Sequence, residues 1–277
     1  IIDSNPEPAV TFTTAGQQVK ESAGTATIGV ELSAISGRDV TVPLMVSGTA
    51  KTPGNFTLPS GTVVIKAGER SGTVPVQVSA NGLNEDDKTV VVSMGVPTHG
   101  VQGKVVTSTV TIVNTDPEPT VSFRSAGSSG EEKSGPARLE VRLSAPSGKP
   151  VTVGYAVTGG TAILGKDYAL AAGVLSFEPG ETSKAIEIDI KNHGIYDDDK
   201  TLEIALKDPK NAVLGSTAAH TRTIVHTAPQ PAVAFLSAIS RGDEKTSSVL
   251  IPVSLSAPSG KPITVEYAVT GGTAEEG

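Results

Sequence analysis

The chain has 277 residues and a formal net charge of −7, because 29 aspartate and glutamate residues outnumber 22 lysine and arginine residues. No basic cluster stands out, so we expect neither nucleic acid nor an anionic membrane surface as a partner. Cysteine is absent, which excludes a disulfide framework and a thiolate metal site. Tryptophan is also absent and aromatic residues make up only 3%, which weighs against a stacking platform for sugars or bases.

A domain-sized repeat dominates the sequence. Leu143–Ala162 reads LSAPSGKPVTVGYAVTGGTA, and Leu255–Ala274 reads LSAPSGKPITVEYAVTGGTA at an offset of 112 residues. A more diverged copy, LSAISGRDVTVPLMVSGTA, begins at Leu32. A period of this length is typical of a single folding domain, so the chain is predicted to be a series of tandem modules.

Three Pro-x-Pro motifs divide the chain. Residues 1–5 resemble the tail of a preceding repeat, residues 6–116 form repeat one, and residues 117–228 form repeat two. Residues 229–277 form the N-terminal part of an incomplete third repeat. Because proline fixes φ and favours extended backbone, we expect short and fairly stiff linkers that build a rod.

Each repeat is predicted to consist of short antiparallel strands. Apolar and polar residues alternate strictly, as in Ile186-Glu187-Ile188-Asp189-Ile190, which is typical of half-buried strands. No stretch shows a helical period of any length. Seven such segments in repeat two, punctuated by turn signals, predict an all-β fold of tandem seven-stranded immunoglobulin-like β-sandwiches. They lie near Thr120–Arg124, Ala137–Leu143, Val151–Thr158, Val174–Glu178, Ser183–Lys191, Thr201–Lys207 and His220–Val225.

The few aromatic residues recur at the same place in each repeat, as core positions do. We therefore expect them to fill the core rather than to bind a ligand. The matching sets are Phe12, Phe123 and Phe235, then Phe56 and Tyr168, then Tyr155 and Tyr267.

Repeat two resembles the Calx-beta repeat. The resemblance rests on a Gly-Thr-Ala at residue 160, the pair Asp167-Tyr168, the turn Phe177-Glu178-Pro179-Gly180-Glu181, an acidic loop at residues 197–199 and a closing Leu-x-x-Pro at residues 206–209. Repeat one keeps a weaker version, and repeat three keeps the opening half. The resemblance implies a seven-stranded sandwich. In some members it also implies calcium at one tip, bound by carboxylates from several loops and from the domain's last residues.

The resemblance carries a set of calcium ligands onto this chain. Calcium takes six to eight oxygen ligands, so convergent carboxylates are the donors that such a site requires. The implied ligands are Glu132, Asp167 and Asp197 in repeat two, and Glu21, Glu85 and Asp116 in repeat one.

This ligand set is degraded. The two aspartates that should open the acidic loop are replaced by Asn192-His193 in repeat two and Ala80-Asn81 in repeat one. Asn55 stands in repeat one where repeat two has Asp167, and repeat two ends in His226-Thr227-Ala228. We therefore favour the interpretation that these acids start a strand, cap turns and keep the tips soluble. Calcium remains a candidate, and no cofactor is certain.

The histidines leave one further alternative. The four histidines lack the paired sequence spacing of a zinc site. His193 and His226 nevertheless fall at ligand positions of the family, so a transition-metal site at the tip of repeat two stays open.

The sequence carries no catalytic signature, and we expect no enzyme activity. There is no GxSxG elbow, no HExxH and no phosphate-cradling glycine loop. No apolar run approaches the roughly 18 residues that span a bilayer, so we expect no membrane insertion in this segment.

Our leading hypothesis is a non-catalytic structural or adhesive module of a large extracellular surface, adhesin-like or filament protein. Its partners would be neighbouring repeats of the same chain, copies of itself in a filament, or other surface proteins. The alternative is a calcium-binding module whose tip ions rigidify linkers or regulate docking.

Overall fold

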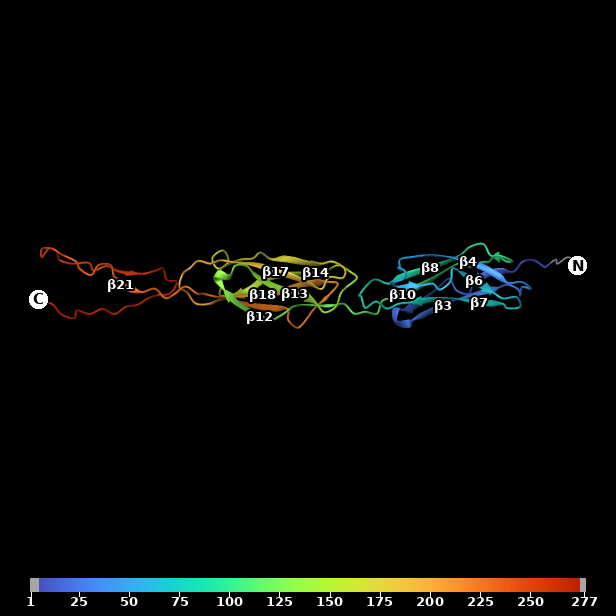
Figure 1. Cartoon of the computed structure of the whole chain (residues 1–277), viewed down its shortest axis with the longest axis horizontal. Helices are drawn as coiled ribbons and strands as arrows, with labels where there is room; N and C mark the ends of the chain where they lie inside the picture. Colours follow the sequence, from blue (N-terminus) through green and yellow to red (C-terminus); the bar gives the residue numbers. More distant parts are fainter. Residues whose placement is uncertain (1–4, 275–277) are drawn as a thin grey trace. The chain divides into compact units, whose positions relative to one another are not determined.

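The computed structural model describes residues 5–274, so nearly all of the predicted tail of a preceding repeat, residues 1–5, lies outside the described residues. Across this range the chain forms β-strands and two short 3₁₀ turns, without any α-helix. No helix in the described part of the chain could therefore span a membrane. We refer to repeats one and two as domain one and domain two, and each is described by itself (Figure 1).

Domain one is a sandwich of two five-stranded sheets, in the orders β5-β7-β3-β1-β9 and β2-β10-β8-β4-β6. The strands of the first sheet are β1 (Ala9–Phe12), β3 (Thr25–Leu32), β5 (Phe56–Thr57), β7 (Ser71–Val78) and β9 (Val101–Gln102). Those of the second sheet are β2 (Gly16–Lys20), β4 (Val40–Ser47), β6 (Thr62–Ile65), β8 (Lys88–Met94) and β10 (Thr107–Val113).

Domain two repeats this topology, with sheets in the orders β15-β17-β13-β11-β19 and β12-β20-β18-β14-β16. Its first sheet contains β11 (Thr120–Phe123), β13 (Ala137–Leu143), β15 (Tyr168–Ala169), β17 (Ser183–Ile190) and β19 (Val213–Leu214). Its second sheet contains β12 (Gly127–Glu131), β14 (Val151–Gly160), β16 (Gly173–Phe177), β18 (Lys200–Lys210) and β20 (Ala219–Val225).

The predicted all-β fold of tandem sandwiches is confirmed. All seven segments predicted in repeat two are strands, and the structure adds three more, β12, β15 and β19. Alternation sets the buried face as expected. In β3, for example, Ala26, Ile28, Val30 and Leu32 are buried, while the residues between them face outward. Burial of these side chains between the two sheets is the main source of stability.

The first strand of each domain crosses from one sheet to the other. In domain two, β11 pairs antiparallel with β13, and after a short turn β12 pairs parallel with β20 in the opposite sheet. The 3₁₀ turn η2 (Glu132–Ser134) follows β12 directly. In domain one, β1 and β2 make the same crossing, and the 3₁₀ turn η1 (Glu21–Ala23) follows β2. The crossing therefore brings a buried glutamate beside the end of the last strand.

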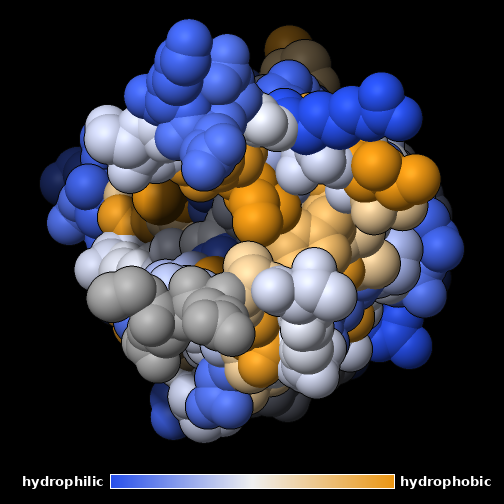
Figure 2. Space-filling model, turned by 90° about the vertical axis from the view of Figure 1, so that its left-hand side faces the viewer, coloured by the Kyte–Doolittle hydropathy of each residue, from blue (hydrophilic) through white to orange (hydrophobic). Residues whose placement is uncertain are grey.

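The described part of the third repeat contains two short paired strands, β21 (Val233–Phe235) and β22 (Val253–Leu255). The expected core role of its aromatic residues is wrong, since Phe235 is 61% and Tyr267 is 90% exposed. Phe123, which matches Phe235, is buried in domain two because a second sheet covers it. No such sheet forms among residues 229–274. Figure 2, viewed from the side of this repeat, shows hydrophobic surface around a hollow.

Replacement of the matched phenylalanines tests this contrast. Phe123→Ala should lower the free energy of unfolding of domain two by about 3–5 kcal/mol, because it leaves a cavity in the core. Phe235→Ala should change stability by no more than about 0.5 kcal/mol, because this ring is exposed. Urea unfolding of the two variants of the full chain measures both values, and equal losses would contradict the difference in packing.

An ion-pair cluster on β13 predicts a dependence of stability on pH. Glu140 accepts hydrogen bonds from Arg142 Nε (2.7 Å), Ser183 Oγ (2.9 Å) and Arg124 Nη1 (3.0 Å). These contacts lower the pKa of Glu140 from its ordinary 4.5 to about 2. A lowered carboxyl pKa contributes stability that is present above pH 4.5 and is lost as the pH falls toward 2. In Glu140→Gln, the urea midpoint of domain two should therefore fall less between pH 5 and pH 2.5 than in the natural chain. An equal fall in both proteins would contradict the lowered pKa of Glu140.

Candidate metal centres

Four titratable side chains converge at one end of domain two. Glu132 begins the turn after β12, and His226 directly follows β20, the strand with which β12 pairs. Asp167 directly precedes β15, which pairs with the end of β17 through Tyr168 and Ile190. His193 lies just beyond the end of β17. Strand pairing in both sheets therefore delivers these residues to the same tip.

The ligand-type atoms of this cluster lie close together. The Nε2 atoms of His193 and His226 are 3.1 Å apart. The Oε2 atom of Glu132 lies 3.6 Å from His226 Nε2 and 3.9 Å from His193 Nε2. The Oδ1 atom of Asp167 lies 3.4 Å from His193 Nε2. We call Glu132, Asp167, His193 and His226 the histidine–carboxylate cluster.

The cluster is buried and only partly satisfied by hydrogen bonds. The side chains of Asp167 and His226 are 1% exposed, that of Glu132 is 2% exposed, and that of His193 is 14% exposed. Asp167 Oδ2 accepts a 2.7 Å hydrogen bond from the Ile163 N–H. In contrast, Glu132 Oε2 and Asp167 Oδ1 have no hydrogen-bond donor among the described residues. Two acceptor oxygens are thus left facing the histidines.

Asp197, the third implied ligand of repeat two, is engaged elsewhere. Its carboxylate accepts hydrogen bonds from the Asp198 N–H (2.8 Å) and from Lys200 Nζ (3.1 Å), and Lys166 Nζ lies 3.9 Å away. The Asp198 hydrogen bond and then the two lysines lower the pKa of Asp197. The lysines therefore neutralise this carboxylate without a metal ion.

The tip of domain one has a different set of donors. Glu21 is buried, and its Oε1 accepts hydrogen bonds from the N–H (2.7 Å) and the hydroxyl (3.0 Å) of Thr115. Asp116 Oδ2 is buried and has no donor among the described residues. Burial raises the pKa of Asp116, and the nearby carboxylates of Glu21 and then Glu85 raise it further. Mutual repulsion among carboxylates at a tip is what a bound cation relieves.

Asparagines occupy the other tip positions of domain one. Asn55 matches Asp167, and its Oδ1 accepts a 2.9 Å hydrogen bond from the Lys51 N–H, while its amide NH₂ offers no ligand atom to a cation. Asn81 matches His193, and Asn114 matches His226. Asn114 donates to the Glu85 carbonyl at 2.9 Å and accepts from the Asp116 N–H at 3.2 Å. Domain one thus contributes oxygen ligands without any imidazole.

Comparison with known proteins identifies the family. The family model for the Calx-beta domain matches residues 3–117 and again residues 114–230. The chain belongs to the Calx-beta family.

Individual relatives are more distant. Sodium/calcium exchanger 1 of Bos taurus is 25% identical over an alignment of 235 residues, and the match covers 76% of this chain and 24% of the exchanger. The exchanger of Rattus norvegicus gives the same values. The chain thus spans about a quarter of the length of these curated relatives. Among solved structures, calcium binding domain CBD12 of CALX1.1 is 20% identical with a TM-score of 0.37, covering 77% of this chain and 98% of that chain. Apo-form Calx CBD1 is 23% identical with a TM-score of 0.38, covering 40% and 99%.

The two Calx-beta tips differ in their fit to calcium. Calcium takes six to eight oxygens, and domain one has carboxylates on Glu21, Glu85 and Asp116, one of them with an unpaired buried oxygen. By donor type these residues suit calcium, but Lys88 Nζ lies 3.8 Å from Glu85 Oε2, and the three carboxylates do not gather within 4.8 Å of one another in the described part of the chain. A bound ion would have to draw them together. In domain two, two imidazole nitrogens take the place of oxygens, and Asp197 is paired with lysines. That set does not fit calcium.

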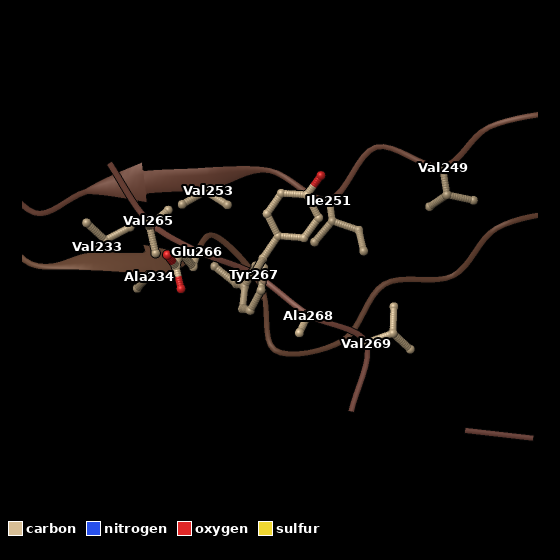
Figure 3. A pocket seen from close by; sticks show the side chains of 11 residues that line it. Val233, Ala234, Val249, Ile251, Val253, Val265, Glu266, Tyr267, Ala268 and Val269 are labelled. Carbon is tan, nitrogen blue, oxygen red and sulfur yellow. The ribbon is translucent and has the colours of Figure 1, made fainter. Parts of the chain in front are cut away.

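The large apolar hollow of the third repeat is a separate feature (Figure 3). Val233, Val253 and Val265 line it, together with Tyr267. The valines that match these three in domain two, 112 residues earlier, are all fully buried core residues. The hollow is therefore an uncovered core and not a built ligand site.

The sequence pointed to single ligand positions but not to the cluster. The resemblance implies Glu132 and Asp167 as ligands; the structure places Glu132 beside both histidines and Asp167 beside His193. A comparison of the two repeats carries the signal for the cluster. Two matched positions differ together, with Asn81 and Asn114 in repeat one and His193 and His226 in repeat two.

Proposed function

We propose that the chain is a non-catalytic pair of Calx-beta domains in which domain one binds a calcium ion at its tip. The observation that carries the proposal is the buried, unpaired Oδ2 of Asp116 beside the carboxylates of Glu21 and Glu85. A dication offsets the repulsion among these groups and satisfies the unpaired oxygen. With three carboxylates and the remaining ligands from carbonyls and water, an affinity of about 10⁻⁴–10⁻³ M is expected, as in extracellular modules.

Calcium should therefore stabilise domain one. At a concentration tenfold above Kd, binding to the native state alone contributes about 1.4 kcal/mol, which should raise the melting temperature by several degrees. Asp116→Asn should abolish this rise. It should also raise the melting temperature without calcium, because it removes one of the repelling charges.

The control is Glu69→Gln, which removes one exposed acidic charge of domain one away from the tip. This variant should keep the full response to calcium. Isothermal titration calorimetry of the full chain measures the heat of calcium binding, and differential scanning calorimetry measures the melting temperature. No heat and no change in melting temperature at millimolar calcium would refute the proposal.

The repetition supports a second, structural role. The strands and turns of residues 143–162 recur almost unchanged at 255–274, whereas the tip residues differ between domains one and two. A scaffold that is maintained while its tips vary suits a module that builds length. We propose that this array belongs to an extracellular surface, adhesin-like or filament protein, with neighbouring repeats, copies of itself or other surface proteins as partners.

Antibody labelling of cells that express the complete reading frame tests the location. An antibody against domain two should label intact, unpermeabilised cells. Labelling that requires permeabilisation would place the domains inside the cell and would refute the surface role. A cytoplasmic marker in the same cells controls for leakage.

A further inference from the structure

We infer that the histidine–carboxylate cluster of domain two is a site for a divalent late transition metal ion of the zinc class. Its ligands are the Nε2 atoms of His193 and His226 and one oxygen each from Glu132 and Asp167. The inference concerns a different domain and a different class of ion from the calcium proposal, and it stands independently.

The distances among three of these side chains are those of ligands around one small ion. Zinc binds imidazole nitrogen and carboxylate oxygen at about 2.0–2.2 Å, so the ligand atoms of a tetrahedral site lie about 3.3–3.6 Å apart. The separations from His193 Nε2 to His226 Nε2 and to Asp167 Oδ1 are 3.1 Å and 3.4 Å. Glu132 Oε2 lies 3.6 Å from one imidazole nitrogen and 3.9 Å from the other. Glu132, His193 and His226 thus offer three ligand atoms that all lie within 4.8 Å of one another, and Asp167 Oδ1 approaches this group from the side of His193.

The donor types select the same class of ion. Imidazole suits zinc, copper, iron and nickel, whereas calcium and magnesium prefer oxygen ligands. The absence of cysteine from the chain excludes thiolate ligands and leaves a site of two nitrogens and two oxygens.

The charge and burial of the two carboxyl groups favour the binding of a divalent cation. Two carboxyl groups are buried beside two imidazoles in a region of low solvent access, where an ionised carboxylate is costly without a counter-charge. Lysines pair with Asp197 but not with Glu132 or Asp167 among the described contacts. A divalent cation balances both carboxylates and satisfies the unpaired oxygens Glu132 Oε2 and Asp167 Oδ1.

One contact must change when the ion binds. The Ile195 N–H donates a 3.3 Å hydrogen bond to His193 Nδ1. A neutral imidazole that binds a metal through Nε2 carries its proton on Nδ1, so the Ile195 N–H has to turn away. The backbone amide of Ile195 is thus a reporter of binding that does not depend on any variant.

Titration of the full chain with zinc and cobalt tests the inference. We expect one equivalent of Zn²⁺ per chain in competition with a chromophoric chelator, and Co²⁺ should give the intense visible bands of a tetrahedral complex. Zinc should raise the melting temperature of domain two. The amide resonance of Ile195 should shift.

Domain one provides the matched variants. His193→Asn and His226→Asn introduce the residues that domain one carries at these positions, Asn81 and Asn114. Each should weaken zinc binding by at least tenfold, and the double variant should abolish the cobalt bands. His99→Asn, which removes a histidine of domain one outside the cluster, should bind zinc like the natural chain. Circular dichroism verifies folding, and His193→Gln with His226→Gln replaces any variant that does not fold.

Two results would overturn the inference. One is the absence of zinc binding and of an Ile195 shift in the natural chain at about 0.1 mM Zn²⁺. The other is equal zinc affinity of the natural chain and the double histidine variant. The two ion proposals fail separately, since Asp116→Asn should leave zinc binding unchanged and the double histidine variant should leave the calcium response unchanged.

Discussion

The crossing of the first strand from one sheet to the other is the constraint on which both tips depend. Because β12 pairs parallel with β20, Glu131 lies opposite Val225, and the next residues, Glu132 and His226, are brought side by side. In domain one, β2 and β10 fix Lys20 opposite Val113 and so set Glu21 beside the residues that follow β10. The register of this parallel pairing sets these positions. The chemistry of each tip then depends on which side chains occupy positions that the sheets have already fixed.

Sequence patterns were sufficient to predict the main strands. The alternation of residues such as Ile186 and Ile188 with polar neighbours specifies a half-buried strand, and hydrophobic burial then enforces it. They were insufficient for β12, because Gly127-Ser128-Ser129-Gly130-Glu131 has no apolar alternation. That strand is held by its parallel pairing with β20, which is a long-range contact without a local signal.

The candidate site was predictable only residue by residue. The family resemblance pointed to Glu132, Asp167 and Asp197 as equivalent ligands, yet they have different surroundings. Lys166 and Lys200 neutralise Asp197, while the other two face histidines. Such pairing depends on side chains that meet in space. Conversely, the core role expected from the recurrence of Phe235 was wrong, since a residue is buried only where a second layer covers it.

Asparagine in domain one is matched by histidine in domain two at two tip positions, and both positions lie beyond the end of a strand. The tip positions follow the ends of strands and lie outside the sheet ladders, so they vary without altering the fold. Domain one has Asn81 and Asn114 where domain two has His193 and His226. The side chains at these two positions therefore offer amide oxygens in one domain and imidazole nitrogens in the other. Two side chains beyond the ends of strands are therefore enough to change the ligand atoms that a tip presents, while the strand order of both sheets stays the same.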